Sequence, residues 1–204
     1  MKRFLLLTLT AMMSLSASFA QQPVYLFPEF EPSTIRFINR TTAEVKVNFD
    51  ALGQGFYYYD GATMMELLNR DLIKDITVGD RTFIFKDGLF CEVFERESGR
   101  VLVNWKFKKV NVGSKGALGA TTQAKVDVLN GSSEYINEIW QQKNNNTYII
   151  TVGDTDYSVK RLKDLYRAFP TVAGQLKAFV RENKLEMTSA EQAFRVIDYL
   201  RSIL

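Results

Sequence analysis

Histidine is absent from this chain of 204 residues, and cysteine occurs once, as Cys91. Without histidine the chain cannot build Ser-His-Asp or Cys-His nucleophilic sites, and it lacks the imidazole ligands of most zinc, copper and non-haem iron sites. One cysteine cannot form a disulfide within the chain. Strand alternation places Cys91 on one face with Leu89 and Val93, so we expect a small buried residue rather than a reactive thiol. The composition leaves catalysis open but favours a non-enzymatic protein, and no motif indicates a cofactor or a metal.

Long hydrophobic runs are also scarce. The apolar stretch at residues 4–13 is too short for a membrane-spanning helix, which needs roughly 20 residues. It follows Lys2 and Arg3 and precedes Ser18 and Ala20, the small residues that a signal peptidase requires before its cut. This order predicts a cleaved secretory signal over residues 1–20. We therefore expect an exported protein, in the periplasm or secreted to the cell surface, with no transmembrane segment in the mature chain.

A strong excess of charge of one sign is missing as well. The chain has 26 Lys and Arg residues against 23 Asp and Glu residues, a formal net charge of +3. Removal of the predicted signal takes away Lys2 and Arg3 and leaves a net charge near +1. The composition therefore predicts no nucleic acid partner. A hydrophobic share of 46% and a charged share of 24% are ordinary for a globular domain.

From residue 21 to residue 156 the sequence is typical of short strands separated by turns. Residues 44–49 alternate between polar and apolar side chains, as in a strand with one buried face. Turn signals at Asp60-Gly61 and Gly79-Asp80 are typical of hairpins. About eight to ten such strands predict an antiparallel β-meander, closed as a barrel or folded as a sandwich. The remaining strands are expected at residues 55–59, 75–78, 81–85, 89–95, 101–110, 124–129, 135–141 and 148–152.

Helical periodicity replaces this alternation after residue 156. Apolar side chains recur at helical spacing over residues 159–169, with Asp156 or Ser158 expected to cap this helix and Pro170 to end it. Two further apolar stripes follow at residues 172–180 and 193–204. The sequence thus predicts an α+β protein, in which an antiparallel β-domain over residues 21–156 precedes a small three-helix subdomain.

The third expected helix carries a start signal of its own. Thr188-Ser189-Ala190-Glu191 fits a capping box, in which the Glu191 side chain reaches back to the cap. Three short helices bury their apolar stripes poorly alone. We therefore expect the subdomain over residues 157–204 to pack on an open face or end of the β-domain.

Three segments carry a resemblance to a known family: DITVGDRTF at residues 75–83, VKRLKDLYRAFP at residues 159–170, and LKAFVRENK at residues 176–184. Over most of residues 40–200 the chain resembles an uncharacterised family of small exported proteins common in Bacteroidota. Gln21-Gln22 after the expected cut also resembles signals of that phylum. The resemblance implies an exported β-domain with a helical tail, and it brings no activity or functional residues with it.

Aromatic and cationic residues interleave in the strand expected over residues 101–110. Trp105 is expected to share the buried face with Phe107, while Lys106 and Lys108 share the solvated face. The functional alternative is a basic stripe that contacts anionic lipid or phosphorylated glycan groups in the envelope.

Residues 56–59 are four consecutive aromatic residues, which cannot all face inward because neighbours in a strand point to opposite faces. Tyr57, Tyr59 and Trp140 are candidates for stacking on sugar rings or for anchoring a protein interface. Half-exposed aromatic residues at the edge of a sheet, without a binding role, are the alternative interpretation.

Three carboxylates, Glu92, Glu95 and Glu97, cluster in one expected hairpin. Glycoside hydrolysis requires two carboxyl groups about 5–9 Å apart in a cleft. Because Arg96 and Arg100 lie beside these glutamates in the sequence, surface ion pairs are the better interpretation.

Together these features predict an exported cell-envelope protein that acts as a non-enzymatic binding or accessory module for an envelope protein partner. The alternative is a β-domain that recognises a cell-surface glycan or lipid, and a hydrolase based on carboxylates or on Lys and Tyr comes third. The candidate contact residues are Tyr57, Tyr59, Trp105, Lys106, Lys108 and Trp140.

Overall fold

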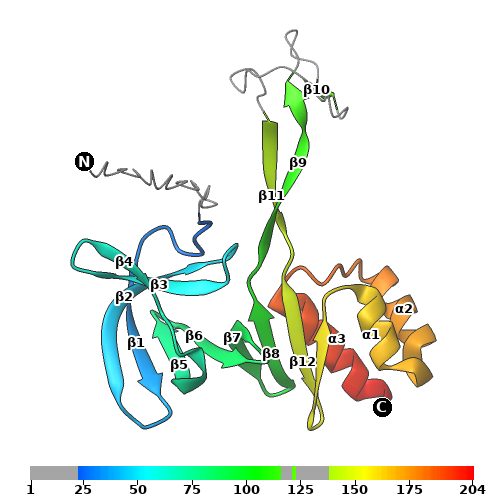
Figure 1. The fold of residues 1–204 in the computed structure, drawn as a ribbon. Coiled ribbons are helices and arrows are strands. Elements are labelled where there is room, and N and C mark those ends of the chain that lie inside the picture. The colour runs from blue at the N-terminus through cyan, green and yellow to red at the C-terminus, as the bar shows by residue number, and fades with distance from the viewer. Residues whose placement is uncertain (1–22, 116–120, 123–137) are drawn as a thin grey trace, which may run out of the picture.

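The computed structural model describes residues 23–115, 121–122 and 138–204, and it has the α+β class that the sequence predicts (Figure 1). A ten-stranded antiparallel sheet is followed by three C-terminal helices. The predicted signal over residues 1–20 and the strand expected at residues 124–129 lie outside the described residues. In the part of the chain that the structure describes, no helix combines the length and apolar character needed to span a membrane.

The strands of the large sheet lie in the order β13-β12-β8-β7-β6-β5-β1-β2-β3-β4. Two connections depart from the predicted meander. After β8 the chain leaves this sheet and returns as β12, which pairs with β8. After β4 the chain passes through the short helix η1 (Arg70–Leu72), and β5 then pairs with β1. β4 is therefore left at the outer edge of the sheet. The bounds are β1 Glu31–Phe37, β2 Thr42–Asp50, β3 Gly55–Asp60, β4 Thr63–Glu66, β5 Ile73–Val78, β6 Arg81–Lys86, β7 Leu89–Arg96, β8 Gly99–Asn104, β12 Thr147–Val152 and β13 Thr155–Val159.

Glycines fix two of the hairpins where the sequence predicts them. Gly61 lies between β3 and β4, and Gly79 lies between β5 and β6, each with a φ of 59°. Glycine adopts this left-handed conformation without steric cost. The short turns also set the register of the strands, with Tyr59 opposite Met64 and Thr77 opposite Thr82.

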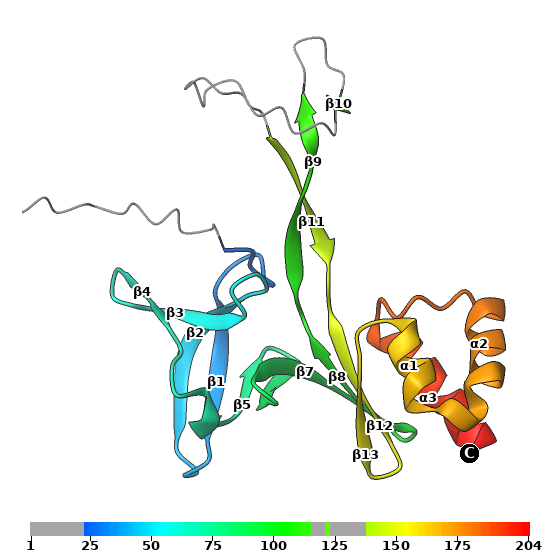
Figure 2. The same cartoon turned by 45° about the vertical axis from the view of Figure 1, so that its right-hand side comes forward.

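A second, three-stranded sheet projects from the body of the molecule as a long arm (Figures 1 and 2). The strand expected over residues 101–110 is interrupted, because two residues, Trp105 and Lys106, separate the end of β8 from the start of β9. At this junction the Lys106 N–H donates to the side chain of Asn146, and the Phe107 N–H donates to the carbonyl of Ala51, each at 2.9 Å. These bonds replace regular strand pairing. The arm contains β9 (Phe107–Lys115), β10 (Thr121–Thr122) and β11 (Glu138–Asn144).

The strands from β1 to β7 curl around an aromatic core. Phe56 of β3 and Phe90 of β7 are separated by four strands in the sheet order, yet their ring centroids lie 5.0 Å apart. Phe49 contacts both rings. The hydrogen bond from the Phe107 N–H to the carbonyl of Ala51 links the segment after β8 to the segment after β2. No pair of described strands closes the curled sheet into a barrel. Of the two predicted arrangements, this open sheet comes nearer to a barrel than to a sandwich.

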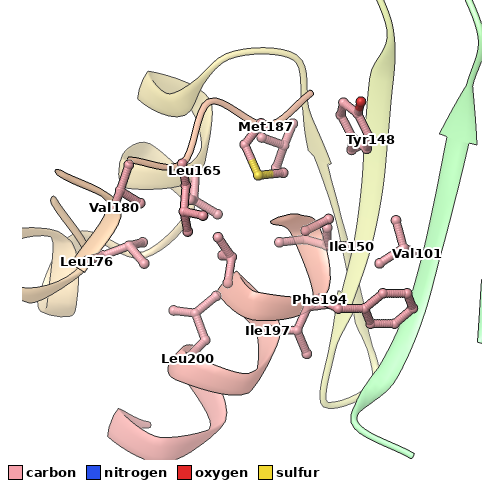
Figure 3. Packing of buried hydrophobic residues seen from close by; sticks show 14 of the residues in the cluster. Val101, Tyr148, Ile150, Leu165, Leu176, Val180, Met187, Phe194, Ile197 and Leu200 are labelled. Carbon is pink, nitrogen blue, oxygen red and sulfur yellow. The ribbon is translucent and has the colours of Figure 1, made fainter. Parts of the chain in front are cut away.

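The helices cover the opposite end of the sheet and bury a second core there. β13 extends past residue 156, the predicted end of the β-domain, and the helices α1 (Leu162–Ala168), α2 (Ala173–Glu182) and α3 (Ala190–Ile203) follow, with the short helix η2 (Pro170–Val172) before α2. Figure 3 shows side chains of β8 and β12 facing side chains of the helices. The labelled residues of this buried cluster are Val101, Tyr148, Ile150, Leu165, Leu176, Val180, Met187, Phe194, Ile197 and Leu200.

Two expected helix caps are wrong. Asp156 and Ser158 both lie in β13, so neither caps α1, whose N-cap is Arg161. Asp156 instead accepts a hydrogen bond from Lys86 at 2.6 Å. Glu191 forms an ion pair with Arg96, while Ser189 caps α3. In both cases a charged partner distant in sequence holds the carboxylate, and the hydrogen bond from that partner lowers the pKa of the carboxyl group.

Cys91 is fully buried, as predicted, on the face of the sheet opposite to the helices. It packs with Leu102 and Ile149, and Leu89 and Val93 lie around it. Burial raises the pKa of the Cys91 thiol to about 12. The thiol therefore stays protonated at neutral pH, a state of low nucleophilicity.

Candidate functional site

The outer edge of β4 has backbone groups without a partner strand. The Leu67 N–H donates to the carbonyl of Phe56 at 2.8 Å, and hydrogen-bonded pairs alternate along an antiparallel ladder. By this alternation Met65 bonds to β3, whereas the N–H and C=O groups of Met64 and Glu66 point away from it. In the described part of the chain no strand pairs with this edge.

Large apolar side chains flank the same edge. Tyr59, Met64 and Met65 are 52%, 45% and 41% exposed, although methionine is mostly buried in folded proteins. Tyr59 stands opposite Met64, so both lie on one face of the β3–β4 hairpin, and Met65 lies on the other. Methionine is flexible and polarisable, and it adapts to partners of different shapes.

The segment before β1 packs against the ring of Tyr59. Phe30 packs against Tyr59 with ring centroids 4.8 Å apart, and Tyr25 packs against Phe30 at 5.4 Å. The Tyr25 hydroxyl lies 3.1 Å from the sulfur of Met64. Buried Asn48 holds this segment in place through side-chain hydrogen bonds to its backbone. We refer to this region as the edge surface, formed by Tyr25, Phe30, Tyr59, Met64 and Met65.

Tyr57, a predicted contact residue, lies on the same face of β3 as Tyr59, which belongs to the edge surface. Burial raises the pKa of the Tyr57 hydroxyl, and the charges of Glu66 and Asp50 raise it further. Tyr57 therefore remains a neutral hydroxyl at neutral pH. Its place beside these acids suits a hydrogen-bond donor better than a general base.

Trp105 lies where the two cores meet and packs against both. Its indole N–H donates to Oε2 of Glu92 at 2.5 Å, and Arg81 donates to both oxygens of the same carboxylate at 2.7 Å. The expectation of a surface ion pair is wrong for Glu92, because the residue is only 4% exposed and its partner Arg81 comes from β6. Glu95 and Glu97 are exposed. The carboxylate of Glu92, held by Arg81, thus orients the indole ring of Trp105.

The other predicted contact residues lie away from the edge surface. Trp105 and Lys106 are half-buried at the junction of β8 and β9, and Lys108 is exposed in β9. The backbone of Trp140 lies in β11, whereas its side chain lies outside the part that the structure describes. The roles of these residues in binding stay predictions, and the structure does not gather all of them into one surface.

Sequence reasoning misses four residues of the edge surface: Tyr25, Phe30, Met64 and Met65. A signal for the two methionines exists, because the Asp60-Gly61 turn predicts a hairpin whose second strand contains both. No local signal marks Phe30. Its contact with Tyr59 depends on the path that the chain takes before β1.

Among the described residues, no three side chains of His, Cys, Asp or Glu gather as metal ligands do. The edge surface itself offers exposed apolar side chains and unpaired backbone groups, which are the chemistry of a protein interface. Comparison of the chain with protein-family models, with curated proteins and with solved structures finds no match.

Proposed function

We propose that this protein is an exported, non-enzymatic accessory module of the cell envelope that binds a partner protein through the outer edge of β4. In the proposed mode, an extended segment of the partner pairs with β4 and lengthens the sheet. The observation that carries the proposal is the outward-facing backbone of Met64 and Glu66, flanked by exposed methionine side chains.

Edge strands are usually protected from such pairing by lysine, proline, a bulge or a covering element. β4 has the sequence TMME and pairs with β3 in a continuous register. Its only charged residue is Glu66 at the end of the strand, and Arg70 neutralises that carboxylate. The middle of β4 therefore has no lysine, proline or bulge to oppose pairing, and only its length of four residues limits the edge.

The two faces of the hairpin indicate what the partner segment looks like. One face presents Met64 beside the ring of Tyr59, and the other presents Met65. In strand addition, backbone hydrogen bonds supply affinity and alternate side chains supply specificity. We expect a partner segment with apolar residues at every second position, which pack on the Tyr59 ring.

Site-specific photocrosslinking in intact cells that naturally produce the protein tests this function. A photoreactive amino acid replaces Met64, and in the control it replaces Lys163, which is exposed on α1. We expect one dominant crosslinked envelope protein from position 64 and none from position 163. No product from position 64, or the same set of products from both positions, would contradict the proposal.

Export is a separate part of the proposal and has its own measurement. The intact mass of the protein purified from the envelope fraction is expected to correspond to a mature chain that begins near Gln21. A chain that retains Met1 and remains in the cytoplasm would contradict export while leaving the contact surface to be judged by crosslinking.

A further inference from the structure

An open groove of about 510 Å³ lies where β1 ends and β5 begins. In Figure 1 the β1–β2 turn lies at the other end of the curled sheet from the β3–β4 turn, so this groove is separate from the edge surface. Its volume suits a small molecule. The groove is lined by Arg36, Phe37, Ile38, Arg40, Thr42 and Lys74.

A β-bulge brings one of these cations into the lining. Arg36 stands opposite Asp75, but the next residue, Phe37, stands opposite Ile73, so Lys74 is the extra residue on β5. Bulges redirect a side chain from its regular place in the sheet. Arg40 reaches the groove from the β1–β2 turn, where it has a φ of 71°, a conformation that is uncommon for residues other than glycine.

The lining contains three cations and no acid. Arg36 donates from Nε to the buried carboxylate of Asp75 at 2.6 Å, so this pair is neutral. For Arg40 and Lys74 the described residues provide no ion pair. The groove therefore keeps two positive charges, together with the two terminal nitrogens of Arg36, for a ligand.

An apolar wall lies beside these charges. Ile38 is 62% exposed and its N–H donates to the carbonyl of Leu72 at 2.9 Å, while Leu72 is itself 58% exposed. Phe37 also lines the groove. A ligand that complements the whole site needs an anionic head for the cations and an apolar body for these side chains.

We propose that this groove binds a single-chain amphiphile with a phosphate monoester head. A phosphate monoester carries about −1.5 to −2 charges at pH 7, which matches the two uncompensated cations, whereas a carboxylate carries only one. The planar guanidinium of Arg36 also suits the oxygens of a phosphate group. The alkyl chain packs on Phe37 and Ile38.

Calorimetric titration of the full-length mature protein with decyl phosphate, kept below its micelle concentration, tests the proposal. Inorganic phosphate serves as the head alone, decyl maltoside as the uncharged amphiphile, and decanoate as the singly charged one. We expect decyl phosphate to bind one to one and at least about tenfold more tightly than each of the other three, because charged hydrogen bonds and apolar contact both contribute. Equal affinity for any one of the three would overturn the assignment.

Variants locate the binding in the groove. Arg40→Gln, Lys74→Gln and Ile38→Ser change exposed side chains, so all three are expected to fold, and each is expected to weaken the binding of decyl phosphate about fivefold or more. The control Lys163→Gln removes one positive charge elsewhere and is expected to leave the affinity unchanged. Unchanged affinity in all three groove variants would contradict the proposal. Photocrosslinking from position 64 does not depend on Lys74 or on any other residue of the groove. A failure of the decyl phosphate titration would therefore leave the proposed partner binding at β4 untouched.

Discussion

β13 and β4 are the two outer strands of one sheet, and each has a row of backbone groups without a neighbouring strand among the described residues. β13 is covered: Tyr157 packs on Phe169 with ring centroids 4.6 Å apart, and Val159 is fully buried next to the helices. The described residues do not cover β4 in this way, because Tyr59 and Met64 are about half exposed.

Three helices thus cover one apolar end of the sheet, whereas no described segment covers the outer side of β4 at the other end. The path of the chain explains this difference, since β5 pairs with β1 and leaves β4 outside. Open apolar edges favour aggregation, so soluble proteins usually avoid them. We therefore interpret the open end as the place where the protein meets its partner.

The largest effect on stability is expected at the covered end. Phe194 of α3 is buried against β8 and β12, and Arg96 lies over its ring at 4.4 Å. Phe194→Ala leaves a cavity in a packed core and is expected to lower the free energy of unfolding by about 3–5 kcal/mol. Urea unfolding followed by circular dichroism measures this loss. A loss below about 1 kcal/mol would show that the helices contribute little at this end.

The next largest effect on stability is expected between the two ends of the sheet, at the junction of β8 and β9. Glu92→Gln keeps the size of the side chain but leaves Arg81 without its counter-charge. We expect the free energy of unfolding to fall by about 2 kcal/mol, because water reaches the partly exposed Arg81 and replaces only part of the lost ion pair. Thermal unfolding measures the loss, and the emission of Trp105, read in a Trp140→Phe background, is expected to shift to the red. An unchanged midpoint with unchanged emission would refute the role of Glu92 in orienting Trp105.

A smaller, pH-dependent effect is expected at β13. The hydrogen bond from Lys86, followed by that from Thr151, lowers the pKa of Asp156 in the folded state. The ionised Asp156 therefore stabilises the fold fully above the pKa of about 3.9 that an aspartate has in the unfolded chain. This stabilisation disappears as the pH falls through the lower pKa that Asp156 has in the folded state.

Asp156→Asn is accordingly expected to be less stable than the wild type by about 1 kcal/mol or less at pH 7, and the gap should narrow below about pH 4. Urea midpoints of both proteins between pH 7 and pH 2.5 give the comparison. A gap that stays constant over this range would mean that the charge of Asp156 does not contribute.

The smallest effect on stability is expected at the open end. Met64→Ala removes a side chain that is already half exposed, so the free energy of unfolding should change by about 0.5 kcal/mol or less. The same urea experiment as for Phe194→Ala makes the two ends directly comparable. A loss as large as that of Phe194→Ala would show that Met64 supports the fold and would weaken its assignment to a partner.

Local patterns predicted most of the fold because hairpins and amphipathic helices depend on neighbours in sequence. The alternation at residues 44–49 lies within β2, and the turn at Gly79 joins the two strands that the sequence predicts on either side of it. The turn at Gly61 is also predicted, but the strand that follows it, β4, is not. The pairing of β5 with β1 was not predictable, because nothing in the intervening residues signals that β4 is passed over. This part of the sheet order is therefore known from the structure alone.

Side-chain partners were predicted less well, because they depend on contacts between distant segments. Glu92 was expected to pair with the arginines beside it in sequence, whereas its partner Arg81 lies across the sheet. Glu191 pairs with Arg96, 95 residues away. Tyr59 was predicted as a candidate contact, but its support by Phe30 depends on where the segment before β1 lies.

Co-purification of the crosslinked partner with Met64→Pro tests the central claim most directly. This variant removes an N–H that points away from β3, so it leaves the β3–β4 ladder intact, as proline on an edge strand allows. Matching circular dichroism and unfolding midpoints confirm that the variant folds, and Glu66→Pro provides a second test of the same edge. Strand addition predicts that both proline variants lose the partner, while Met64→Ala, which keeps the N–H, retains part of it. Full retention of the partner by folded Met64→Pro and Glu66→Pro would contradict the account.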